Sequence, residues 1–147
     1  MSREYNIYFF GSINGGTSDI KPWYRPMIRR LEKFGTVLSA DIFFKPEILE
    51  GTESDVWPDE IFERDIAFIN RADVLVGDVT IPSTGVGYEL GHARAKGKPI
   101  LCLHRSTGHS LSAIIEGNSY IVVRYYKALP AAYGHITRFF KSLRTQS

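Results

Sequence analysis

The chain has 147 residues, of which 44% are hydrophobic and 23% charged, and its formal net charge is +2. These values exclude an intrinsically disordered chain and predict one domain, residues 1–147, with a core that needs no disulfide or metal. The small charge excess does not indicate binding to nucleic acid or to an anionic membrane. No apolar run approaches the roughly 20 residues of a membrane span, and no signal segment is seen, so we expect a soluble, cytoplasmic protein.

Apolar strand-like runs alternate with amphipathic segments along the chain. Strands are predicted at residues 5–10, 36–44, 74–79, 99–104 and 120–125. Helices are predicted at residues 23–34, 58–72, 86–96, 111–116 and 131–143, with an acidic loop at 45–56. This alternation predicts an α/β fold: a single three-layer domain with a five-stranded parallel sheet and helices on both faces, Rossmann- or flavodoxin-like. Ligands of such sheets bind beyond the carboxyl ends of the strands, here the loops after residues 10, 79 and 104.

A glycine-rich loop, Gly11-Ser-Ile-Asn-Gly-Gly16, follows the first strand. It has neither the spacing of a dinucleotide fingerprint nor the Gly-Lys-Ser/Thr of an ATPase phosphate loop. Its glycines would let the backbone approach a ligand, and Ser12 offers a hydroxyl group at the end of the strand. A tight turn and a ligand-binding loop are equally good interpretations of this segment.

The segment Thr80-Ile-Pro-Ser-Thr-Gly-Val-Gly-Tyr-Glu-Leu-Gly91 indicates a binding site more strongly. It leads from the third strand into a helix whose free N–H groups favour an anion, and Ser83 adds a hydroxyl group there. Glu89 lies early in that helix, and Gly85 and Gly87 leave space around it. The alternative is that Glu89 is a surface carboxylate and that the glycines pack against the sheet.

Asp65 lies at the margin of the apolar face of its predicted helix, where a carboxylate needs a partner or a ligand. A salt bridge and a place in a binding site explain it equally well. Asp78, late in the third strand, could reach the ligand edge, whereas Asp73 looks structural. Tyr8, on the first strand, could bring its hydroxyl group to the same edge.

The sequence lacks the motifs that several kinds of chemistry require. The four histidines show no metal-ligand spacing, and Gly-x-Ser-x-Gly is absent, so neither a metal site nor a serine hydrolase is predicted. Cys102, in an apolar run, is interpreted as a buried strand thiol. We expect no cofactor.

These motifs together resemble the nucleoside 2-deoxyribosyltransferase superfamily, and within it the 2′-deoxynucleoside 5′-phosphate N-hydrolases. The matching segments are collinear and cover most of the chain: residues 8–16, 34–38, 64–65, 71–76, 82–91, 100–103 and 111–115. The block Gly85-Val-Gly-Tyr-Glu-Leu-Gly91 is the most specific of them.

The resemblance implies hydrolysis of the base–sugar bond of (2′-deoxy)nucleoside 5′-monophosphates through a covalent glycosyl-enzyme intermediate. It makes Glu89 the nucleophile and Asp65 a second carboxylate that positions the sugar or handles a proton, with Tyr8 holding Glu89 by a hydrogen bond. It also implies a homodimer in which Ser112 completes the site of the partner subunit. The remaining residues that it implies in substrate binding are Ser12, Ile13, Asn14, Gly15, Ser83, Gly85 and Gly87.

One position departs from the pattern of the hydrolases, which have arginine where this chain has Asn14. Phosphate binding then loses a charge-assisted contact unless another cation, such as Lys21 or Arg105, reaches the site. Three alternatives stay open: a transferase that exchanges bases, a ribonucleotide (CMP-type) N-glycosidase, and a nucleotide-binding module without catalysis.

Overall fold

The computed structural model describes residues 4–13, 20–49, 56–106, 108 and 110–146. The strands are β1 (Tyr5–Phe10), β2 (Gly35–Val37), β3 (Val74–Asp78), β4 (Ile100–Arg105) and β5 (Val122–Tyr126). The helices are α1 (Lys21–Leu31), α2 (Ala40–Phe43), α3 (Pro46–Leu49), α4 (Pro58–Arg71), α5 (Thr84–Ala95), α6 (Ala113–Glu116) and α7 (Leu129–Arg144). None of the helices in the described ranges is long and apolar enough to cross a membrane.

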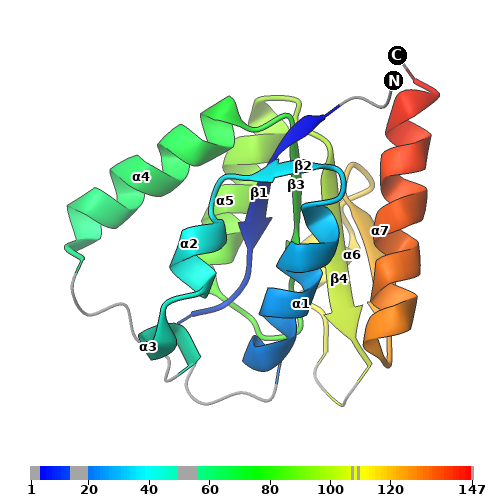
Figure 1. Cartoon of the computed structure of the whole chain (residues 1–147), viewed down its shortest axis with the longest axis horizontal. Coiled ribbons are helices and arrows are strands. Elements are labelled where there is room, and N and C mark those ends of the chain that lie inside the picture. Colours follow the sequence, from blue (N-terminus) through cyan, green and yellow to red (C-terminus); the bar gives the residue numbers. More distant parts are fainter. Residues whose placement is uncertain (1–3, 14–19, 50–55, 107, 109, 147) are drawn as a thin grey trace.

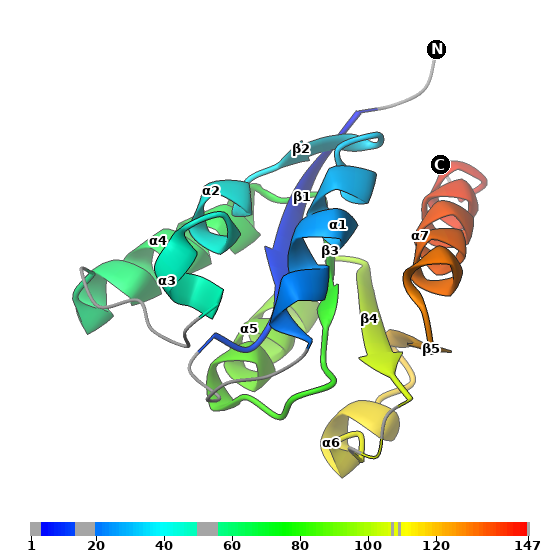
Figure 2. The ribbon, with the colours of Figure 1, turned by 60° about the horizontal axis from the view of Figure 1, so that its bottom comes forward.

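All five strands run parallel in the order β2-β1-β3-β4-β5, which confirms the predicted fold class. The chain leaves β1 toward one edge of the sheet, returns to β3, and then continues toward the other edge. The reversal of strand order therefore falls between β1 and β3. Figures 1 and 2 show the carboxyl ends of the strands at the bottom of the first view, brought forward in the second.

The strand period of two distributes the side chains of β1 between two cores. Ile7 and Phe9 pack in a cluster with α1, α2 and α7. Tyr8 and Phe10 face the other cluster, to which α4 contributes Ile69 and α5 contributes several buried residues. In Figure 1, α1 lies in front of the sheet and α5 behind it. This alternation places the Tyr8 ring on the same side of the sheet as α4 and α5.

The strand predicted at residues 36–44 is wrong after residue 37, where β2 ends. Pairing between β2 and β1 ends at Val37 and Ile7, and α2 follows. The reason is Ser39, whose buried hydroxyl group donates to the carbonyl of Phe9 (2.8 Å) and accepts from its N–H group (3.0 Å). Because a side chain satisfies these backbone groups, no further strand residue is needed beside β1. The loop predicted at 45–56 begins with the short helix α3, and residues 50–55 lie outside the described ranges.

Local sequence signals set the bounds of α5. Ser83 is the N-cap, and its hydroxyl oxygen accepts a hydrogen bond from the N–H group of Val86 (3.2 Å). At the other end, Gly97 has φ +72°, the left-handed conformation that commonly follows a helix and that glycine adopts without strain. The start of α5 is thereby fixed directly beyond the end of β3.

Candidate active site

A cavity of about 380 Å³ lies where the strand order reverses. The residues that follow β1 form one wall, the residues that lead into α5 form another, and α4 closes the cavity with Ile61 and Asp65. This is the location that a parallel sheet favours for a ligand. The described lining residues are Gly11, Ser12, Ile13, Ile61, Asp65, Pro82, Ser83, Thr84, Gly85, Val86 and Glu89.

Glu89 lines this cavity, and Tyr8 contacts it from β1 without being one of the lining residues. The phenol of Tyr8 donates a hydrogen bond to Oε2 of Glu89, although 81 residues separate them in the sequence. Tyr8 is only 3% exposed and packs against the ring of Phe68 of α4. The contact forms because Tyr8 points from β1 toward α5 and because Glu89 lies on the side of α5 that faces the cavity.

Burial is the main cause that raises the pKa of Glu89 to about 7. The negative charge of Asp65 raises this pKa further, whereas the Tyr8 hydrogen bond and the positive charge of Arg64 lower it. Burial, together with the charges of Glu89 and Asp65, raises the pKa of Tyr8 well above its usual value. Tyr8 therefore remains a hydrogen-bond donor at physiological pH, and Glu89 titrates within the physiological range.

Asp65 reaches the same cavity from α4, and it also forms an ion pair. Its Oδ1 lies 2.9 Å from Nε of Arg64, and the two side chains are 19% and 22% exposed. The ion pair expected from the sequence is therefore present, and Asp65 also lines a cavity, whereas its place in a binding site stays a prediction. The matching family segment includes residues 64–65, but helix geometry did not predict this contact, because neighbouring residues on a helix normally point in different directions.

The predicted substrate-binding residues divide between this cavity and a neighbouring one. Ser12, Ile13, Ser83 and Gly85 line the cavity that contains Glu89. Asn14 and Gly15 lie outside the described residues. Sequence reasoning missed Ile61 as a lining residue, although its position four residues before Asp65 places it on the same face of α4.

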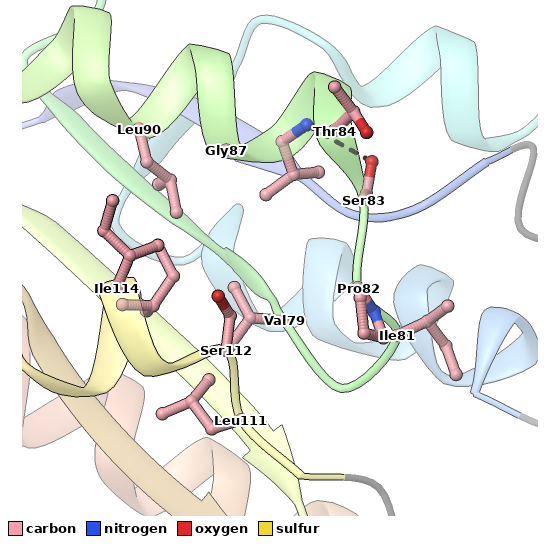
Figure 3. A pocket seen from close by; sticks show the side chains of 12 residues that line it. Val79, Ile81, Pro82, Ser83, Thr84, Gly87, Leu90, Leu111, Ser112 and Ile114 are labelled. Carbon is pink, nitrogen blue, oxygen red and sulfur yellow. Dashed lines mark hydrogen bonds between the residues drawn. The ribbon is translucent and has the colours of Figure 1, made fainter.

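Gly87 and Ser112 line a second, mostly apolar cavity of about 350 Å³ on the other side of the α5 N-terminus. Figure 3 shows Ser83 and Thr84 on one side of it, and Leu111 and Ser112 on the other. Ser112 does not line the cavity of Glu89 in its own chain. The two cavities share Pro82, Ser83, Thr84 and Val86.

The glycines near Glu89 leave open space. A Cβ atom added to Gly87 or Gly91 would meet no neighbouring atom within 4 Å, so neither glycine packs against the sheet. This geometry excludes the alternative in which Gly87 and Gly91 pack against the sheet.

Lys21 and Arg105 could replace the arginine that the hydrolases have at position 14, but neither lines the cavity of Glu89. Lys21 is buried and donates a hydrogen bond to the carbonyl of Ile13, on the loop that follows β1. The guanidinium group of Arg105 lies 3.8 Å from the ring centroid of Trp23. Among the described residues that line the cavity, none is lysine or arginine.

Two other acidic residues serve the fold. Asp73 accepts a hydrogen bond from the N–H group of Asn6 (2.8 Å), as its structural interpretation predicted. Asp78 does not line the cavity; it is 1% exposed and accepts hydrogen bonds from the Tyr126 hydroxyl (2.6 Å) and from the N–H of Thr80 (2.8 Å). Burial raises its pKa to about 6.

Cys102 is a buried free thiol, as predicted, and burial raises its pKa. Over the part of the chain that the structure describes, no three His, Cys, Asp or Glu side chains group as a metal site would require.

Fold and site together define an α/β protein with a cavity at the switch point of a parallel sheet. The family model described as nucleoside 2-deoxyribosyltransferase matches residues 7–123. The chain therefore belongs to the nucleoside 2-deoxyribosyltransferase family, which confirms the resemblance of its motifs.

Relatives in this family include proteins named 5-hydroxymethyl-dUMP N-hydrolase. The Mus musculus protein is 47% identical over 116 residues, which cover 76% of this chain and 65% of the mouse protein. The Homo sapiens protein is 45% identical over 112 residues, covering 76% and 64%. The chain thus spans slightly less than two thirds of these two relatives. The Esox lucius protein is 40% identical over 144 residues, covering 94% and 97%.

Solved structures share the fold at lower identity. The Clostridium botulinum CMP N-glycosidase BcmB has a TM-score of 0.61 at 20% identity and covers 89% of this chain and 97% of its own. BlsM, solved in solution, has a TM-score of 0.71 at 21% identity and covers 96% and 93%.

Proposed function

We propose that this protein is an N-glycosidase that hydrolyses the base–sugar bond of (2′-deoxy)nucleoside 5′-monophosphates. The observation that carries the proposal is the hydrogen bond from Tyr8 to Glu89 in a cavity that also contains Asp65. The names of relatives that are 40–47% identical support a nucleotide substrate. They also support a 5-substituted deoxyuridylate as the first substrate to test.

In the first step, a carboxylate oxygen of Glu89 attacks the anomeric carbon of the sugar. The bond between that carbon and the base nitrogen breaks, its electron pair stays on the base, and the base takes up one proton from solvent. The transition state is cationic at the sugar, so a neighbouring carboxylate stabilises it. Tyr8 orients Glu89 through its hydrogen bond, and Asp65 approaches the sugar from α4.

In the second step, water attacks the same carbon and displaces Glu89. The water loses one proton, so nucleotide and water together become free base and sugar 5-phosphate. We expect the α5 N-terminus to bind the phosphate, because Ser83, Thr84 and the first turn of this 12-residue helix line the cavity, and a helix N-terminus favours an anion.

The test is chromatography of free base after incubation with a panel of nucleotides. The panel holds 5-hydroxymethyl-dUMP, the four deoxynucleoside monophosphates, their ribo counterparts and the unphosphorylated nucleosides. Base release from deoxynucleotides in wild type, with none in Glu89→Gln, is the expected result. New nucleosides that form only when a second free base is added would identify a transferase. Release of base from ribonucleotides alone would identify a CMP-type enzyme. Thermal stabilisation by nucleotide without release of base would identify a binding module.

We further propose a homodimer in which Ser112 of one subunit completes the site of its partner. Two observations support this: Ser112 lines the cavity that adjoins the one with Glu89, and Ile114 beside it is 80% exposed. Sedimentation measures the oligomeric state. Mixing inactive Glu89→Gln with impaired Ser112→Ala then tests sharing, because each mixed dimer contains one intact site.

Random exchange makes half of the dimers mixed, so about a quarter of all sites should regain activity. Mixing Glu89→Gln with Tyr8→Phe is the control, because both substitutions lie in the same subunit's site and no mixed site is fully restored. A monomer in solution, or no recovery in the first mixture, would contradict the shared site.

A further inference from the structure

Arg64 adopts an unusual position on α4. Neighbouring residues on a helix point in different directions, yet Nε of Arg64 lies 2.9 Å from Oδ1 of Asp65. Both side chains are less than a quarter exposed, so the guanidinium group does not extend into solvent. Its charge also acts on Tyr8 of β1 and on Glu89 of α5.

Two carboxylates lie at the same cavity, and Arg64 places a positive charge beside them. Asp65 and Glu89 approach one cavity from α4 and α5, and the negative charge of Asp65 disfavours ionisation of Glu89. The described groups that act electrostatically on Glu89 are Tyr8 from β1, and Asp65 and Arg64 from α4. Of these, only Arg64 carries a positive charge, and none of the described cavity-lining residues supplies another.

We propose that Arg64 is a positioning residue that holds Asp65 as an ion-paired anion, so that Asp65 accepts hydrogen bonds from the sugar instead of delivering a proton to the base. This decides between the two roles that the family resemblance leaves open for Asp65. The same ion pair lets Glu89 ionise beside a second carboxylate. The kinetic part of the inference rests on the proposed function, whereas the electrostatic part does not.

The kinetic test compares Arg64→Gln with Arg64→Lys, which retains a positive charge. Glu89 must be ionised to attack, so removal of the positive charge moves the acid limb of the kcat/KM profile to higher pH. We expect kcat/KM of Arg64→Gln at pH 6 to fall at least about three-fold more than at pH 8.5. Arg64→Lys should restore the limb. Arg71→Gln is the matched control, an exposed arginine in the last turn of the same helix.

A second substrate separates the two roles of Asp65. A deoxyribose 5-phosphate that carries 4-nitrophenolate as leaving group needs no proton at the departing atom. If Asp65 positions the sugar, Asp65→Asn should slow this substrate and the natural nucleotide by the same factor. If the nitrophenyl substrate is spared, Asp65 acts as the acid and the inference is wrong.

A titration that needs no turnover tests the electrostatic part by itself. Carboxyl ¹³C NMR of glutamate-labelled protein, with the Glu89 signal assigned by Glu89→Gln, measures the ionisation of Glu89 directly. We expect this titration to move to higher pH in Arg64→Gln and to stay in place in Arg71→Gln. An unchanged titration in Arg64→Gln overturns the inference. If wild type releases no base but the titration moves as expected, the proposed function fails and the electrostatic role of Arg64 stands.

Discussion

The phenol of Tyr8 on β1 donates a hydrogen bond to the carboxyl group of Glu89 on α5. The bond joins β1, the second strand in the order of the sheet, to the helix that begins the second wall of the cavity. It keeps one carboxylate oxygen of Glu89 occupied and leaves the other to act, and it opposes the rise in the pKa of Glu89 that burial causes.

Tyr8→Phe should therefore reduce turnover without abolishing it. Loss of a hydrogen bond to a charged group corresponds to about a ten- to hundred-fold decrease in kcat. The acid limb of the pH profile should also move to higher pH, because the hydrogen bond no longer favours the ionised carboxylate. Tyr88→Phe, an exposed tyrosine next to Glu89, is the control and should match wild type. Equal kcat values for Tyr8→Phe and wild type would mean that Tyr8 does not hold the nucleophile.

Glu89→Gln should stabilise the fold at alkaline pH. The pKa of Glu89 is raised from 4.5 to about 7 in the folded protein, so folding favours the protonated carboxyl group. Stability is then greatest below pH 4.5 and decreases as pH rises through 7. For this half-buried side chain we expect a gain on the order of 1–2 kcal/mol at pH 8 that disappears near pH 4.5. Urea unfolding at both pH values measures it, with exposed Glu63→Gln as control. A variant less stable than wild type at pH 8 would refute the raised pKa.

Tyr126→Phe should destabilise the fold at neutral and alkaline pH. It removes the donor that lies 2.6 Å from the buried carboxylate of Asp78. Because burial already raises the pKa of Asp78 to about 6, the ionised form depends on its donors. We expect a loss of about 1–3 kcal/mol at pH 8 and a smaller loss at pH 5, where Asp78 is largely protonated. Thermal unfolding at the two pH values measures this, and the exposed neighbour Tyr125→Phe provides the comparison. A loss that did not vary with pH would exclude Asp78 as its cause.

Asn14→Arg should lower KM for nucleoside monophosphates, because none of the described lining residues supplies a positive charge. A charge-assisted contact to the phosphate corresponds to about a ten-fold decrease in KM, with little change in kcat. The same variant assayed with the unphosphorylated nucleoside is the control, since its KM should not change. If KM for the monophosphate is also unchanged, another group already neutralises the phosphate.

Gly87→Ala and Gly91→Ala form a matched pair on α5. Neither added methyl group meets an atom within 4 Å, so each variant should gain about 0.5–1 kcal/mol of stability from better helix propensity. Gly87 lines a cavity and Gly91 lines neither of the two at the α5 start, so only Gly87→Ala should raise KM. Unfolding and steady-state assays on both variants test this. An unchanged KM in Gly87→Ala would remove Gly87 from the substrate-binding residues.

Local patterns in the sequence were sufficient to predict that this protein has a sheet between two layers of helices. The alternation of apolar runs and amphipathic segments predicted five parallel strands with helices on both faces, and the family motifs marked Tyr8, Asp65 and Glu89. These features depend on residues close together in the chain. The helix predicted at residues 86–96 corresponds to α5, which begins two residues earlier because Ser83 is its N-cap.

Contacts between distant segments were decided only by the tertiary structure. The short apolar run after residue 37 fits a strand or a helix equally well, and the Ser39 hydroxyl group bound to Phe9 makes it a helix. Likewise, only the packing of α4 beside α5 shows that Arg64 acts on Glu89, and only the sheet shows that Asp78 turns to Tyr126 and away from the cavity. The physical reason is that charge–charge and hydrogen-bond partners are set by distance in space, which the pattern of neighbouring residues does not encode.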